Sequence, residues 1–180
     1  MTRTTLAPPP SSAAIPLRDS ILGLGSLALP GLGFVVGLAL VSGREGFPDL
    51  ADAGTIPWEL WLIGVAGIAA TVAGYLDWRY HITGRRLVGA RERKGELIAL
   101  GFGGVPLFFL MMAASVAERP EVYLLPILAT VLFTTGMICY DEFVFHRRSC
   151  TRFETALHRT LVFGNGTAWA AWMHWIFVRG

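Results

Sequence analysis

Five apolar runs, each close to the length that crosses a lipid bilayer, constrain what this chain of 180 residues can fold into. About 20 apolar residues in an α-helix match a hydrocarbon core about 30 Å thick. Charged residues make up 16% of the chain, against roughly 25% in soluble domains, which favours a membrane protein. We predict an all-α, polytopic integral membrane protein with five transmembrane helices, at about 21–41, 56–76, 97–116, 122–140 and 161–178.

The segment before the first run, residues 1–19, is rich in Pro, Ser, Thr and Ala and is predicted to be a disordered cytoplasmic tail. No cleavage pattern of small residues follows the first run, which argues against a removable signal peptide. Residues 20–180 are then a single transmembrane helical domain. Cys139 and Cys150 indicate neither a disulfide framework nor a thiolate metal site.

Lysine and arginine are distributed unevenly among the loops. Twelve of the 15 lie before the first run, in residues 77–96, or between the fourth and fifth runs, whereas Arg44, Arg119 and Arg179 lie in the other loops. Because cytoplasmic loops retain positive charge, this predicts a bacterial-type inner (plasma) membrane protein with a cytoplasmic N-terminus and an external C-terminus. Membrane lipids are the expected partners of the basic loops, and no nucleic-acid partner is expected.

Three of the four histidines follow a carboxylate by four residues, a spacing that places both side chains on one face of a helix. Glu92 and Glu96 form a fourth pair with the same spacing. The predicted topology puts all four pairs at cytoplasmic helix ends, so we ask whether they form one site. The three histidine pairs are Asp77/His81, Glu142/His146 and Glu154/His158.

The pairs also suggest an internal repeat. Aligning His81 with His146 brings Asp77 onto Glu142, and shortening the loop by three residues then aligns Glu92 with Glu154. Two hairpins with the same charge pattern are expected to be related by an axis along the membrane normal. We therefore predict that the second to fifth helices form a four-helix bundle of two repeated hairpins.

The chemistry of these side chains favours a metal site. Oxygen and nitrogen ligands suit Fe, Mn or Zn, whereas Cu(I) would call for thiolate or thioether. Glu and His that project from facing helices hold two ions in carboxylate-bridged four-helix bundles, where iron can activate dioxygen, while a single zinc would support hydrolysis. The candidate metal ligands, in order of preference, are Glu142, His146, Glu154, His158, Asp77, His81, Glu96 and Glu92.

Our leading hypothesis is therefore a non-haem metalloprotein, foremost a di-iron oxidoreductase, that acts on a lipid or other apolar substrate. Since no nucleotide or flavin fingerprint is present, the electrons would come from a donor protein. No organic cofactor and no catalytic residue is assigned.

Other interpretations remain open. The same groups could serve a transporter of protons or divalent cations, or be solvated ion pairs, such as Glu154 with Arg152, in a non-catalytic subunit or assembly factor. His174, among tryptophans, is expected to be an interfacial residue and not a ligand. The spacing Gly33-x-x-x-Gly37 in the first run allows a homo-oligomer through that helix.

Overall fold

A computed structural model of the chain describes residues 17–82, 90–144 and 151–179, and almost all of these residues are helical. No β-strand occurs within these ranges, which confirms the all-α prediction there. Short helical turns lie between or after the main helices: η1 (Ala53–Thr55), η2 (Leu100–Gly104), η3 (Pro120–Tyr123) and η5 (Trp175–Arg179). The α-helices are α1 (Leu17–Val41), α2 (Trp58–Ile82), α3 (Ala90–Ala99), α4 (Val105–Val116), α5 (Leu124–Val144) and α6 (Arg152–His174).

Within the described residues, four helical segments are long and apolar enough to cross a membrane: Ser20–Val41, Trp58–His81, Leu97–Val116 and Pro120–Tyr140. They coincide with the first four predicted runs and indicate a membrane protein. The fifth run falls in α6 and η5, which are not among the four by composition, because Asn165 and His174 lower their mean hydropathy.

The start of the chain differs from the prediction by about one turn. Residues 17–19, assigned to the tail, form the beginning of α1, while residues 1–16 lie outside the described residues.

Helices α3 and α4 form one rod that the π-helical turn η2 interrupts. Pro106, the second residue of α4, cannot donate a backbone hydrogen bond, and its ring would clash with a carbonyl one turn earlier. A π-turn of Leu-Gly-Phe-Gly-Gly immediately before it changes the hydrogen-bond register. Gly103 within this turn lies so close to Thr134 of α5 that a side chain would collide there.

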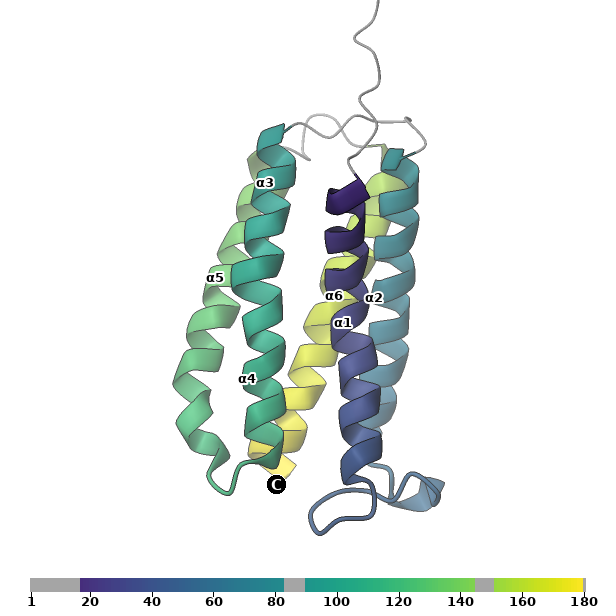
Figure 1. Cartoon of the computed structure of the whole chain (residues 1–180), viewed down its shortest axis with the longest axis vertical. Helices are drawn as coiled ribbons and strands as arrows, with labels where there is room; N and C mark the ends of the chain where they lie inside the picture. Colours follow the sequence, from purple (N-terminus) through teal and green to yellow (C-terminus); the bar gives the residue numbers. More distant parts are fainter. Residues whose placement is uncertain (1–16, 83–89, 145–150, 180) are drawn as a thin grey trace, which may run out of the picture.

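The long helices α1, α2, α5 and α6 and the rod of α3 and α4 lie side by side along the long axis of the molecule (Figure 1). Helix α6 packs against α2 in the opposite direction, α1 packs on α2 and α4, and the rod of α3 and α4 packs on α5. The buried core joins α4 and α6 through Met111 and Trp172, and α5 contributes Ile127.

The contact between α2 and α6 is made by small residues. Ala66 and Ala70 of α2 are buried where Gly164 of α6 crosses them. A Cβ at position 164 would lie 2.9 Å from the carbonyl oxygen of Ala66. Further along, Gly74 leaves room for Leu27 of α1 and for Leu161 of α6. Close approach at small residues is how helices gain van der Waals contact in lipid, where the apolar solvent supplies no driving force.

The predicted glycine face on α1 packs against another helix of the same chain. Gly33 receives the ring of Phe108, and Gly37 receives the end of Met112, both from α4. A homo-oligomer through α1, which stays a prediction, would therefore use another part of this helix.

We predict that Gly164→Ala destabilises the protein, since the new methyl group would meet a backbone carbonyl that cannot rotate away. Overpacking of this kind costs about 1–3 kcal/mol, which thermal unfolding in detergent would show as a lower Tm. Gly166→Ala is the matched control, because nothing lies within 4 Å of that position and alanine favours the helix. Equal Tm values for the two variants would contradict this account of the contact between α2 and α6.

Candidate metal centre

Asp77, His81 and His158 meet where the last turns of α2 pack against the first turns of α6. Asp77 and His81 are one turn apart on α2, so both side chains lie on the same face. His158 comes from the second turn of α6. One ligand atom from each residue lies within 4.8 Å of the other two. The structure thus joins two of the predicted pairs across the helix contact.

Two separations within this cluster join the Asp77 carboxylate to the two imidazoles. Asp77 Oδ2 lies 3.5 Å from His81 Nε2 and 3.5 Å from His158 Nε2. Protein N–H···O hydrogen bonds measure about 2.7–3.2 Å, so these contacts are long for hydrogen bonds. Neighbouring ligand atoms at about 2.0–2.2 Å from one ion are ~3.4 Å apart in tetrahedral coordination and ~3.0 Å apart in octahedral coordination. The residues present therefore fit a divalent transition metal ion.

Asp77 also carries a buried oxygen with no hydrogen-bond partner among the described residues. Its Oδ1 makes no hydrogen bond with any part of the chain that the structure describes, and the same holds for the indole nitrogen of Trp78. Most buried polar atoms are hydrogen-bonded, so two neighbouring exceptions need an explanation. An ion or an ion-bound molecule beside Asp77 would supply one for the carboxylate.

Glu154 borders the cluster from α6. Its Oε2 accepts a hydrogen bond from the backbone nitrogen of Thr151, and the Thr151 hydroxyl accepts one from the backbone nitrogen of Glu154, which is a complete capping box. The side chain of Glu154 is fully buried, and its Oε1 lies 3.6 Å from His81 Nε2. A solvated ion pair with Arg152 therefore does not describe Glu154.

The remaining predicted ligands are placed only in part. Glu92 and Glu96 lie on α3, and Glu142 lies near the end of α5, but their side chains are not described. His146 lies outside the described residues. Helices α3 and α5 pack on each other. The start of α3 and the end of α5 lie at the same end of the molecule as the cluster (Figure 1).

Comparisons of the chain with protein-family models, with curated proteins and with solved structures found no match. The interpretation of this centre therefore depends on its own geometry.

A second charged cluster, which the sequence analysis did not predict, lies at the opposite ends of α2 and α6. Glu59, fully buried in the first turn of α2, accepts a hydrogen bond of 2.9 Å from His174 Nδ1 and one of 3.0 Å from Arg179 Nη1. Because a carboxylate only accepts, Nδ1 of His174 must carry a proton. An acid at the start of an apolar run was the available signal, since such acids in membranes need partners.

His174 was expected to be an interfacial residue among aromatic rings. Its ring does lie 5.3 Å from that of Trp58, and its side chain is partly exposed. The bond to Glu59 shows that it also ties α6 to α2.

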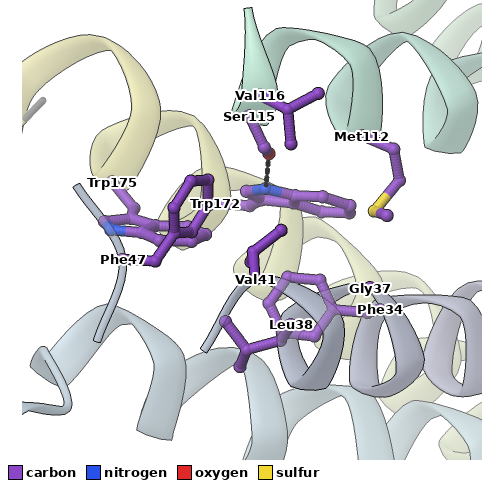
Figure 2. Close-up of a pocket in the computed structure, with 10 residues that line it drawn as sticks. All are labelled: Phe34, Gly37, Leu38, Val41, Phe47, Met112, Ser115, Val116, Trp172 and Trp175. Atoms are coloured by element: carbon purple, nitrogen blue, oxygen red, sulfur yellow. Dashed lines mark hydrogen bonds between the residues drawn. The ribbon is translucent and has the colours of Figure 1, made fainter. Parts of the chain in front are cut away.

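A small apolar pocket lies near this second cluster (Figure 2). Trp172 crosses it and donates a hydrogen bond of 2.9 Å from Nε1 to the hydroxyl of Ser115, while Phe47 packs edge-on against Trp175. No residue that lines the pocket is charged. The pocket lies at the end of α6 opposite the candidate metal centre and offers no carboxylate, imidazole or thiol side chain.

We predict that Arg179→Ala lowers Tm, because the buried Glu59 carboxylate loses one of its two partners. Arg179 is half exposed, so screening limits the loss to about 1 kcal/mol, or about 2–4 °C in a chain of this length. Arg119→Ala, which removes an exposed pair with Glu121, is the control and should leave Tm unchanged. Indistinguishable effects on thermal unfolding would show that the Glu59 cluster does not stabilise the fold.

Proposed function

We propose that this chain is an integral membrane metalloprotein that binds a divalent transition metal ion through Asp77, His81 and His158. The observation that carries the proposal is the convergence of two imidazoles and one carboxylate from two helices within 4.8 Å. A second observation on the same carboxylate supports it: Oδ1 of Asp77 is buried and has no hydrogen-bond partner among the described residues.

Two imidazoles and one carboxylate form the ligand set of non-haem Fe(II) oxygenases, and a similar set holds catalytic zinc. We favour iron and an oxidative reaction on a lipid or other apolar substrate. In this proposal the centre lies at the end of a membrane-spanning helix, beside Trp78 and Tyr80, where an apolar molecule in the bilayer could reach it. A donor protein would supply electrons.

A di-iron centre would need further ligands. The described cluster offers three ligand atoms, with Glu154 adjacent, which suits one ion. A second ion would require the other predicted ligands: Glu92 and Glu96 of α3, Glu142 of α5, and His146, which lies outside the described residues.

We also propose five membrane crossings. Helix α6 has 23 residues, or about 35 Å at 1.5 Å per residue, and runs along α2, which itself is a membrane-length helix. The helix contacts also support two repeated hairpins, one made of α2 with the rod of α3 and α4, and the other of α5 with α6. An axis that exchanges the hairpins would turn the contact of α2 with α6 into the contact of α5 with that rod, and both contacts are present.

A transporter is a weaker proposal. A path through the bilayer along the α2–α6 contact would need ionisable groups between the two charged clusters. The residues from Leu60 to Gly74 of α2 contain none, and Leu161 to Met173 of α6 contain none.

We predict that the purified full-length protein binds about one equivalent of Fe(II), Mn(II) or Zn(II), and that Asp77→Asn and His158→Ala abolish this binding. Equilibrium dialysis with elemental analysis would measure the stoichiometry. Glu118→Gln, at an exposed carboxylate outside the centre, is the control. Unchanged metal content in Asp77→Asn, with helicity checked by circular dichroism, would refute the site.

Reporter fusions would test the five crossings. We predict that a reporter active only in the cytoplasm works when fused at the N-terminus and that one active only outside works at the C-terminus. An even number of crossings would place both ends on one side and would contradict the proposed path of α6.

A further inference from the structure

Glu154 stands at the edge of the proposed centre but outside its ligand set. A fourth tetrahedral ligand would lie ~3.4 Å from each of the other three. Glu154 Oε1 lies 3.6 Å from His81 Nε2, yet Glu154 does not belong to the group whose ligand atoms all lie within 4.8 Å of one another. Its carboxylate therefore borders the coordination sphere on one side only.

The local structure holds Glu154 in this place. The capping box with Thr151 fixes Oε2 at the start of α6, and the whole side chain is buried. Turning the carboxylate toward Asp77 and His158 would break the bond to the Thr151 nitrogen and leave that helix end without its cap.

We propose that Glu154 is a positioning residue: its Oε1 accepts a hydrogen bond from an O–H or N–H of the molecule that occupies the remaining coordination position. This inference rests on the proposed metal centre and names the ligand class that the centre takes. Two carboxylates beside that position, Asp77 and Glu154, favour a neutral, proton-bearing ligand such as water or an alcohol. They disfavour anions such as a carboxylate or a phosphate.

The test uses the full-length protein in detergent, loaded with Co(II), whose visible spectrum reports coordination. Azide is the probe of the remaining position. We expect the unmodified protein to bind Co(II) and to bind azide weakly. Glu154→Gln should retain Co(II), because glutamine preserves the capping box, and should bind azide about tenfold tighter or more, because the repelling charge is gone. Glu154→Asp, which keeps the charge, should bind azide as weakly as the unmodified protein does.

Three outcomes would overturn the inference, and they are distinguishable. Loss of Co(II) from Glu154→Gln, to the extent seen in Asp77→Asn, would make Glu154 a ligand while the metal centre stands. A spectrum that azide changes in no variant would mean that the protein itself fills the remaining position. Failure of the unmodified protein to bind Co(II) would remove the proposed function together with the inference.

Discussion

The close antiparallel contact between α2 and α6 is the constraint on which the rest of the structure depends. Residues with small side chains, Ala66, Ala70 and Gly164, let the two backbones approach in the middle of the helices. The same register then brings Asp77 to His158 at one end and Glu59 to His174 at the other. Glu59 and Asp77 are 18 positions apart in α2, or ~27 Å at the helical rise, which is close to the thickness of a hydrocarbon core.

The charged clusters at the two ends of the helix pair and the small residues between them favour the same register of α6 against α2. A slip of α6 by one turn would move its residues about 5.4 Å along α2. Such a slip would separate Glu59 from Arg179 and His174, and leaving a buried carboxylate without partners is costly. The contact at Gly164 favours the same register, because a slip by one turn would bring Thr160 or Ala168, each with a Cβ, against Ala66. The hydrogen bonds to Glu59 therefore reinforce a register that the helix contact already prefers.

The sequence contained enough to predict helices of membrane-spanning length and to name all three residues of the candidate centre. Apolar length identified four helices that are long enough to cross a membrane. The four-residue spacing placed Asp77 with His81, and Glu154 with His158, on one face of their helices. Spacing describes one helix at a time, however, and the observed contacts run between helices: Asp77 with His158, and His81 with Glu154. Glu59 was missed for the same reason, because its partners follow it by more than 100 residues and meet it only when α6 docks.

The two clusters provide an internal comparison, since they lie at opposite ends of the same helix pair. Both oxygens of Glu59 have partners at 2.9 and 3.0 Å, which are hydrogen-bond distances, so this cluster is closed by the protein's own groups. Asp77 differs in both respects: one oxygen lies 3.5 Å from two imidazole nitrogens, and the other has no hydrogen-bond partner among the described residues. The wider spacing around Asp77 is the feature on which the proposed metal centre depends.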